Sequence, residues 1–179
     1  MIALIYGGSG SGKSRFAENM MTGLKEFASA LFYVATMYPG DAEARGRIAR
    51  HQADRAHKGF ATIEVYTNLD SVNIPDGSAV LLECLGNLVA NEMFSPDGAG
   101  EGAMEAVLRG VEAVSKRAVR VVAVTNDVFS DGVLYPPETE RYRRVLGELN
   151  KAVAQKSAVV VETVCGLPLW HKRDKGWNP

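Results

Sequence analysis

Short apolar runs alternate with amphipathic helical patterns along almost the whole chain. The runs are nearly continuous in valine, isoleucine, leucine and alanine, which is typical of strands buried on both faces. They predict strands over residues 2–6, 31–36, 79–82, 119–125 and 158–163, with a less regular strand over 62–66. The spacing of apolar positions between them predicts helices over residues 13–27, 42–57, 85–93, 101–117 and 138–155. This alternation indicates an α/β fold, a mainly parallel sheet flanked by helices on both sides.

The C-terminal part departs from this alternation. The segment "VETVCGLPLW" predicts a final antiparallel strand pair, with Gly166 and Pro168 shaping its turn. The charged end, "HKRDKGWNP", predicts a frayed tail, and "SPDGAGEG" at 95–102 predicts an exposed loop. Too little chain lies on either side of that loop for two cores, so the sequence predicts one domain over residues 1–179.

The first predicted turn carries the glycine-rich motif "GGSGSGKS" between a strand and a helix. This is the phosphate-binding loop (P-loop) pattern, a glycine, four residues of any kind and then Gly-Lys-Ser. Glycines let backbone N–H groups face a phosphate, the helix N-terminus adds positive charge, and the lysine reaches the outer phosphates. The predicted phosphate-binding residues are Gly7, Gly8, Ser9, Gly10, Ser11, Gly12, Lys13 and Ser14. A glycine-rich turn without a ligand is the alternative, but the strand–loop–helix context favours a P-loop NTPase-like (RecA-like) fold.

The composition argues against several kinds of binding partner and indicates a cellular compartment. A net charge of −1 provides no broad basic surface for nucleic acid or an anionic membrane. No apolar run is long enough to span a bilayer, and the apolar start is too short for a signal peptide. The two cysteines, Cys84 and Cys165, lack metal-binding spacing and predict buried free thiols in a reducing cytoplasm.

Polar residues follow several predicted strands, and ligands of open parallel sheets bind beyond the carboxyl ends of the strands. These residues are Thr36, Glu83 and the run at 125–127. We expect Glu83 and the hydroxyl of Ser14 to hold magnesium, because P-loop proteins pair the loop hydroxyl with an acid at a strand end. The alternatives are that Glu83 only caps the next helix, and that Asp127 serves as the acid or caps a turn.

A histidine lies in the predicted helix "GRIARHQADR". Arg47, His51 and Arg55 follow at intervals of four residues, so they share one polar face. Two guanidinium groups beside an imidazole favour its neutral form, which has the lone pair that a nucleophile needs. Taken alone, a solvated basic helix face is the stronger interpretation. His57 and His171 have no such neighbours and are predicted to be surface residues.

The motifs "GGSGSGKSRFAE", "YVAT", "RIARHQADR", "LLEC" and "VTNDV" occur in this order. Together they resemble the bifunctional adenosylcobinamide kinase and adenosylcobinamide-phosphate guanylyltransferase family of cobalamin biosynthesis, over residues 1–172. The resemblance implies phosphorylation of adenosylcobinamide by a nucleoside triphosphate, ATP or GTP, and then transfer of GMP from GTP to that phosphate. It also implies a guanylyl-histidine intermediate on His51, a magnesium cofactor and a homotrimer.

The resemblance further implies nucleotide-contacting residues outside the P-loop. They are Thr36, Met37, Tyr38, Gln52, Ala53, Asp54, Arg55, Glu64 and Glu83. Two other functions stay open: a plain P-loop kinase that phosphorylates another alcohol, and a nucleotide-sensing module that signals by shape. A plain kinase would not need the basic face around His51, and no switch segment is readable for a sensor.

Overall fold

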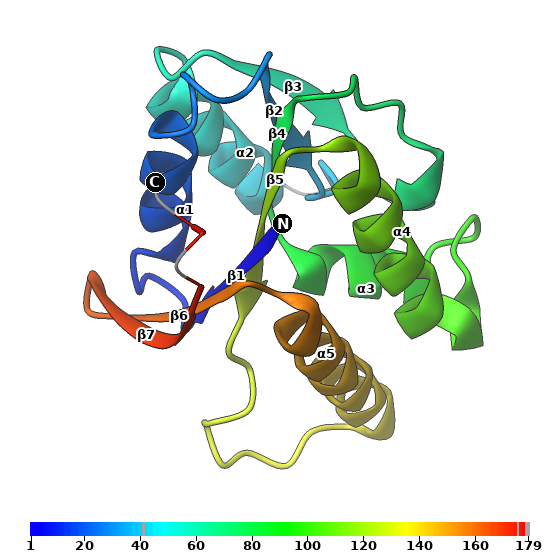
Figure 1. Cartoon of the computed structure of the whole chain (residues 1–179). Helices are drawn as coiled ribbons and strands as arrows, with labels where there is room; N and C mark the ends of the chain where they lie inside the picture. The colour runs from blue at the N-terminus through cyan, green and yellow to red at the C-terminus, as the bar shows by residue number, and fades with distance from the viewer. Residues whose placement is uncertain (41, 175, 178–179) are drawn as a thin grey trace.

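A seven-stranded sheet in the order β3-β2-β4-β5-β1-β6-β7 forms the centre of the molecule (Figure 1). The structure is a computed structural model and describes residues 1–40, 42–174, 176 and 177. Strands β1 to β6 run parallel, and β7 pairs antiparallel with β6. The strands are β1 (Ile2–Gly7), β2 (Leu31–Ala35), β3 (Phe60–Glu64), β4 (Ala79–Leu82), β5 (Arg120–Asn126), β6 (Val159–Val164) and β7 (Leu167–Arg173). The predicted parallel α/β sheet with a C-terminal antiparallel pair is therefore confirmed.

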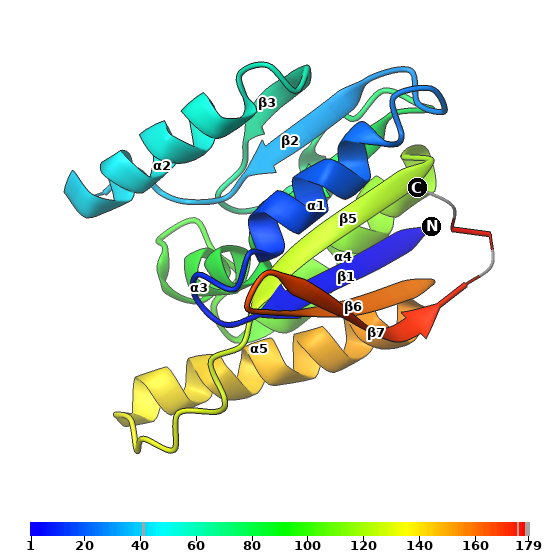
Figure 2. The ribbon, with the colours of Figure 1, turned by 90° about the vertical axis from the view of Figure 1, so that its left-hand side faces the viewer.

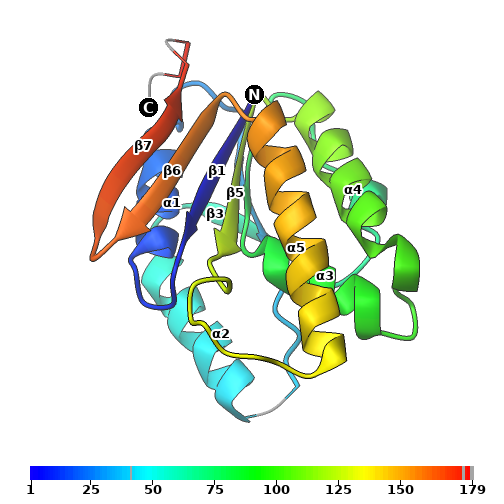
Figure 3. The same ribbon diagram turned by 90° about the horizontal axis from the view of Figure 1, so that it is seen from below.

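Helices cover both faces of the sheet, as Figures 1 and 3 show. The α-helices are α1 (Lys13–Thr22), α2 (Ala42–Arg55), α3 (Leu85–Phe94), α4 (Ala103–Arg117) and α5 (Pro137–Lys156). Two short 3₁₀ helices, η1 (Leu69–Ser71) and η2 (Gly100–Gly102), precede β4 and α4. Helices α3, α4 and α5 lie on one face, and α1 lies on the other. Among the described helices, none is both long and apolar enough to cross a bilayer.

The core consists of two apolar clusters, one on each face of the sheet. Successive side chains of a strand point to opposite faces, so β1 contributes to both clusters. Ile2 and Leu4 pack with α3, α4 and α5, whereas Ala3 and Ile5 pack with α1. This two-sided burial explains why the strands have continuous apolar sequences rather than alternating ones.

Most element boundaries fall within two residues of the prediction, and α1 is the main exception. It ends at Thr22, with Gly23 as its C-cap, rather than at residue 27. The chain continues as turns in which Leu24 is still buried. The predicted helix was too long because Leu24 continues the helical spacing of apolar positions, although the helix has already ended.

Two predictions about the C-terminal part are wrong. The tail is not simply frayed, because residues 171–173 belong to β7, and Trp177 is buried beneath the guanidinium of Arg120. Cys84 is buried as predicted, but Cys165 is exposed. Cys165 lies in the turn between β6 and β7, with a φ of 50°, rather than in the apolar strand itself.

Candidate active site

The P-loop forms a tight turn between β1 and α1. Gly10 and Gly12 have φ angles of 70° and 92°, in the left-handed region that glycine tolerates best. Gly12 is the N-cap of α1, whose first N–H groups lack intrahelical partners. The Nζ atom of Lys13 donates a hydrogen bond to the carbonyl oxygen of Gly8 at 3.0 Å. Burial lowers the pKa of Lys13. A phosphate bound in the loop would favour its charged form.

The hairpin of β6 and β7 braces the P-loop, a contact that the sequence analysis missed. The hydroxyl oxygens of Ser11 and Thr163 are 2.8 Å apart, and the N–H of Gly166 donates to the carbonyl oxygen of Ser11 at 2.9 Å. A Cβ atom added at Gly7 would lie 2.6 Å from the carbonyl oxygen of Thr163. The loop is therefore held by the C-terminal hairpin as well as by β1. The only signal in the sequence was a polar Thr163 near the end of an apolar strand.

Glu83 follows β4, and its carboxylate accepts three hydrogen bonds. The hydroxyl of Tyr33 donates to Oε1 at 2.8 Å, and the N–H groups of Thr36 and Met37 donate to Oε2 at 2.8 and 3.1 Å. Glu83 thereby fastens the segment after β2 to the end of β4. It does not cap the next helix, because the N-cap of α3 is Cys84, whose Sγ accepts the N–H of Asn87.

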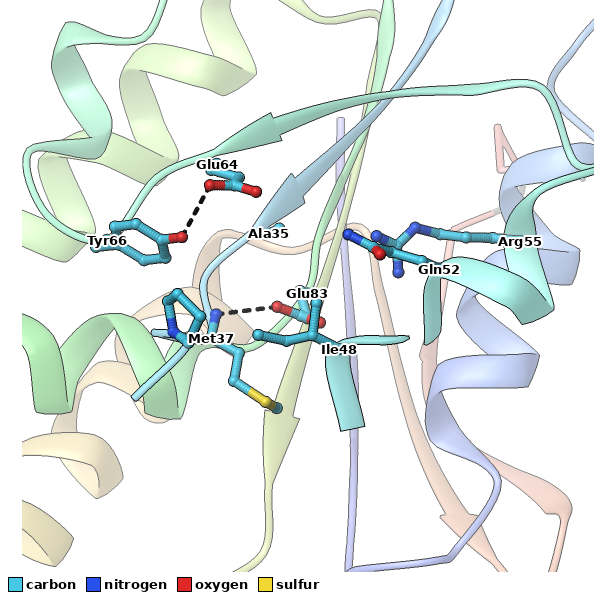
Figure 4. Close-up of a pocket in the computed structure, with 9 residues that line it drawn as sticks. Ala35, Met37, Ile48, Gln52, Arg55, Glu64, Tyr66 and Glu83 are labelled. Carbon is cyan, nitrogen blue, oxygen red and sulfur yellow. Dashed lines mark hydrogen bonds between the residues drawn. The ribbon is translucent and has the colours of Figure 1, made fainter. Parts of the chain in front are cut away.

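A cavity lies between α2 and the carboxyl ends of β2, β3 and β4 (Figure 4). Gln52 and Arg55 enter it from α2, opposite Glu64 and Tyr66. The lining residues are Ala35, Met37, Pro39, Ile48, Gln52, Arg55, Glu64, Tyr66 and Glu83. The structure thus brings together five of the nucleotide-contacting residues that the resemblance implies: Met37, Gln52, Arg55, Glu64 and Glu83.

The other implied residues lie elsewhere. Thr36 is buried and does not line the cavity, and its hydroxyl donates to the carbonyl oxygen of Cys84. Tyr38 is 62% exposed, and its ring meets the ring of Tyr66 edge-on at 5.2 Å between centroids. Ala53 is exposed on α2, and the side chain of Asp54 lies outside the described part of the chain.

The sequence analysis did not single out Tyr66, which faces a predicted acid. Its hydroxyl donates to Oε2 of Glu64 at 2.9 Å. Burial, followed by this hydrogen bond, raises the pKa of Tyr66 to about 12. The phenol therefore remains a hydrogen-bond donor at neutral pH and orients the Glu64 carboxylate at the rim of the cavity.

The predicted solvated basic face of α2 is wrong for Arg55. Only 5% of this residue is exposed, and its guanidinium lies 3.5 Å above the ring of Tyr33. Its Nη1 atom is buried without a hydrogen-bond partner among the described residues. Burial and the neighbouring Glu83 raise the pKa of Tyr33, so the ring stays neutral beneath the cation. An unsatisfied buried donor is costly, and an anion entering the cavity would satisfy it. The side chain of Arg47 lies outside the described part.

A buried ion pair holds the same end of α2. Lys58, three residues beyond the helix, donates from Nζ to Oε2 of Glu18 on α1 at 2.5 Å. Glu18 is 3% exposed, so this contact is shielded from water. The end of α2 is therefore tied to β2 through Tyr33 and to α1 through Glu18.

The three histidines have different surroundings. His51 is partly buried on α2 and is not among the residues that line the cavity. His57 is exposed, and His171 is half exposed on β7, where it lies 2.9 Å from Glu162. His57 and His171 are thus surface residues as predicted, and the nucleophilic role of His51 stays a prediction.

Asp127, the alternative acid, caps a turn. Its Oδ1 accepts the N–H of Phe129 at 3.0 Å, and its Oδ2 accepts the hydroxyl of Ser130 at 2.8 Å. Both oxygens are thus engaged within the loop that follows β5, in the manner of an Asx turn.

Known proteins are similar to this chain in sequence or in fold. A family model described as cobinamide kinase / cobinamide phosphate guanyltransferase matches residues 3–170. The bifunctional adenosylcobalamin biosynthesis protein CobP of Pseudomonas aeruginosa is 33% identical over 171 residues, covering 93% of this chain and 94% of the relative. Its counterpart CobU of Escherichia coli is 31% identical over 184 residues, covering 93% and 97%.

A solved structure supports the fold independently. The KaiC-like protein PH0186 from Pyrococcus horikoshii superimposes with a TM-score of 0.53 over 97% of this chain and 80% of that chain, at 14% identity. This likeness concerns the fold alone, which is the P-loop NTPase-like arrangement that the glycine motif predicts. The match over residues 3–170 and the two full-length relatives go further: the chain belongs to the cobinamide kinase / cobinamide phosphate guanyltransferase family.

Proposed function

We propose that this chain is a bifunctional transferase that phosphorylates adenosylcobinamide and then transfers GMP from GTP to the new phosphate. The supporting observations are a P-loop closed by the hydrogen bond from Lys13 to Gly8, and a polar cavity at the carboxyl ends of β2, β3 and β4, in a member of this family. In the first reaction the alcohol oxygen of adenosylcobinamide bonds to the γ-phosphorus of the triphosphate. The bond from that phosphorus to the bridging oxygen breaks, and the hydroxyl proton is released.

His51 is the proposed nucleophile of the second reaction. An imidazole nitrogen bonds to the α-phosphorus of GTP, and pyrophosphate leaves. A phosphate oxygen of adenosylcobinamide phosphate then bonds to the same phosphorus, the phosphorus–nitrogen bond breaks, and adenosylcobinamide-GDP forms. The covalent intermediate divides one difficult displacement into two easier ones.

The P-loop residues from Gly7 to Ser14 are the proposed site of the triphosphate, and the cavity beside α2 is the proposed nucleotide site. The cavity offers carboxylates at Glu64 and Glu83, the amide of Gln52 and the unpartnered Nη1 of Arg55. Carboxylates accept hydrogen bonds from a base or ribose, whereas a guanidinium binds phosphate oxygens. Of these groups Arg55 is best suited to stabilise charge during the displacement.

Magnesium is the proposed cofactor, held by Ser14 and Glu83. The described residues contain no group of three or more His, Cys, Asp or Glu side chains that could hold a metal. A site with only the two protein ligands Ser14 and Glu83 fits an ion that keeps its water molecules and binds mainly to phosphates, as magnesium does. Ser14 lies in the first turn of α1, and its hydroxyl has no hydrogen-bond partner among the described residues. When bound, magnesium neutralises negative charge on the triphosphate.

The proposed assembly is a homotrimer in the cytoplasm. Exposed apolar side chains on β7 and in the loop before α5 support self-association: Leu134, Leu167 and Leu169 are 96%, 68% and 50% exposed. Both cysteines are unpaired, which supports a reducing compartment. Light scattering of the purified protein would measure the number of subunits.

The decisive experiment is incubation with α-labelled GTP and magnesium. We expect acid-labile, alkali-stable label on the protein, lost in His51→Ala and kept in the matched variant His57→Ala. Label that survives in His51→Ala would rule out this nucleophile. Mass spectrometry after adding cobinamide separates the alternatives: a plain kinase gives only a phosphorylated product from some alcohol, and a sensor module gives no cobinamide product.

A further inference from the structure

Asn126 ends β5 directly beside the P-loop and has no role in the site described so far. Its Cα pairs with that of Gly7 across the parallel ladder, and the N–H of the next residue donates to the Gly7 carbonyl oxygen at 2.9 Å. Val122 and Val124 pack with α1, so alternation along the strand places Asn126 on the face of α1 and the loop. Thr125 points the other way, and its hydroxyl donates to Asn150 on α5 at 2.9 Å.

A buried thiol orients the Asn126 amide. Its Nδ2 donates to Sγ of Cys84 at 3.6 Å, and that sulfur also accepts the N–H of Asn87 at the start of α3. Burial raises the pKa of the Cys84 thiol, so the sulfur is a neutral acceptor. The charge of the Lys13 ammonium acts on the pKa of Cys84 in the opposite direction, so Cys84 lies near the P-loop lysine. With Nδ2 engaged, Oδ1 makes no hydrogen bond to any described residue.

Few protein oxygens beside the P-loop remain available to a hydrated cation. The Oε2 atom of Glu83 accepts two hydrogen bonds from the segment after β2, so only Oε1, which accepts one from Tyr33, keeps a lone pair for the proposed ion. Both oxygens of Asp127 are engaged in a turn. Amide oxygens are hard ligands that bind magnesium or its water molecules as carboxylates do, without adding negative charge next to a triphosphate.

We propose that Asn126 is a binding residue for the magnesium–triphosphate unit, with its Oδ1 as the oxygen that would contact the hydrated ion. The proposal rests on the proposed use of a magnesium–nucleoside triphosphate at this loop. Asn126 would supply a neutral oxygen from the strand next to β1, in addition to the proposed ligands Ser14 and Glu83. Cys84 is a positioning residue that acts through the amide of Asn126.

Nucleotide affinity, rather than turnover, tests this role. The affinity for a non-hydrolysable GTP analogue is measured by calorimetry over a magnesium titration and again in EDTA. Asn126→Ala and the similarly sized Asn126→Leu should raise the magnesium concentration for half-maximal tightening by about 10- to 100-fold, as loss of an outer ligand does. Affinity in EDTA should stay at the wild-type value. Asn126→Asp restores an oxygen, so it should bind well with magnesium and worse than wild type in EDTA, because its charge repels the bare triphosphate.

Matched variants separate binding from folding. Asn150→Ala removes the amide partner of Thr125 on the opposite face of the sheet and should leave the magnesium titration unchanged. Cys84→Ser keeps an acceptor for the amide, whereas Cys84→Ala should shift the titration in the direction of Asn126→Ala. A wild-type titration curve in Asn126→Ala, or equal weakening with magnesium and in EDTA, would overturn the proposal.

The outcome is independent of the guanylylation chemistry. Labelling of wild-type His51 tests the proposed function on the same preparation. A labelled wild type with an unchanged titration in Asn126→Ala contradicts only the role of Asn126. An unlabelled wild type contradicts the nucleophile instead.

Discussion

Helices α1 and α2 both present residues of the proposed site, but they are held very differently. α1 begins at the P-loop, buries Ala17, Glu18, Met20 and Met21, and packs on β1, β4, β5 and β6. Of the described residues of α2, only Arg55 is fully buried. Figure 2 shows α1 lying over the sheet, while α2 extends outward beside β2 and β3.

The P-loop is thus held by several contacts, whereas the proposed nucleophile, His51, lies on a helix with few buried side chains. Lys13 is fixed across its loop, and the loop is braced by the β6–β7 hairpin. His51 is carried by α2, and the buried contacts of its C-terminal end are Arg55 on Tyr33 and, just beyond the helix, Lys58 on Glu18. Because Arg55 is the one buried side chain among the described residues of α2, small changes at this end should affect His51 without affecting the P-loop.

The largest effect is expected at the P-loop. Lys13→Met removes the charge that reaches the outer phosphates, and should lower the rates of both phosphorylation and His51 labelling by about 10²- to 10³-fold. Initial rates with labelled GTP measure this. Lys25→Met changes an exposed lysine just beyond α1 and should behave as wild type. Equal rates in Lys13→Met and Lys25→Met would contradict the assignment of Lys13.

A variant at the anchor of α2 tests the other side of the comparison. A desolvated cation–π contact contributes about 2 kcal/mol, equivalent to about 30-fold in the docked population of the helix. Arg55→Leu should therefore reduce His51 labelling and speed hydrogen exchange along α2, with α1 unaffected. The matched change at exposed Arg50 on the same helix should alter neither. Faster exchange in both helices would show that α2 is not independently held.

Glycine substitutions compare strained and unstrained positions within the P-loop. At Gly12, φ is 92° and an added Cβ would lie 3.2 Å from Cα of Gly166, whereas a Cβ at Gly8 meets nothing within 4 Å. Gly12→Ala should cost about 1–2 kcal/mol of stability or triphosphate affinity. Gly8→Ala should reduce the stability much less, as thermal unfolding of the two variants would measure. Similar losses for both would mean that the loop rearranges easily.

The smallest expected effect is a pH dependence of the affinity of the P-loop for the triphosphate. Burial lowers the pKa of Lys13 below its ordinary value of 10.5, because it disfavours the charged form. The charged form is present below the lowered pKa of Lys13 and is lost as the pH rises through that pKa. Affinity for the triphosphate analogue should therefore fall by about twofold when half of the lysine has lost its proton, at a pH below 10.5. Lys13→Met should abolish this decline, and a constant wild-type affinity up to pH 10.5 would contradict it.

Local sequence patterns predicted the fold well, because strands that are buried on both faces have continuous apolar sequences. The range 79–82 is reproduced without change, and the other strands shift by one or two residues. The tail was misjudged because Trp177 finds its place through Arg120, far away in sequence. The solvated face of α2 was misjudged because the ring that receives Arg55 belongs to β2.

The sequence by itself determined the α/β alternation, the P-loop and the family motifs, because these depend on short-range periodicity and on residues close together in the chain. Tertiary structure decided which groups meet. Parallel pairing brings the ends of β2 and β4 together, so Glu83 fastens the segment after β2. Pairing of β5 with β1 places Asn126 beside Gly7, and the β6–β7 hairpin reaches back to Ser11. Such contacts join residues tens to more than a hundred positions apart, and no local pattern specifies them.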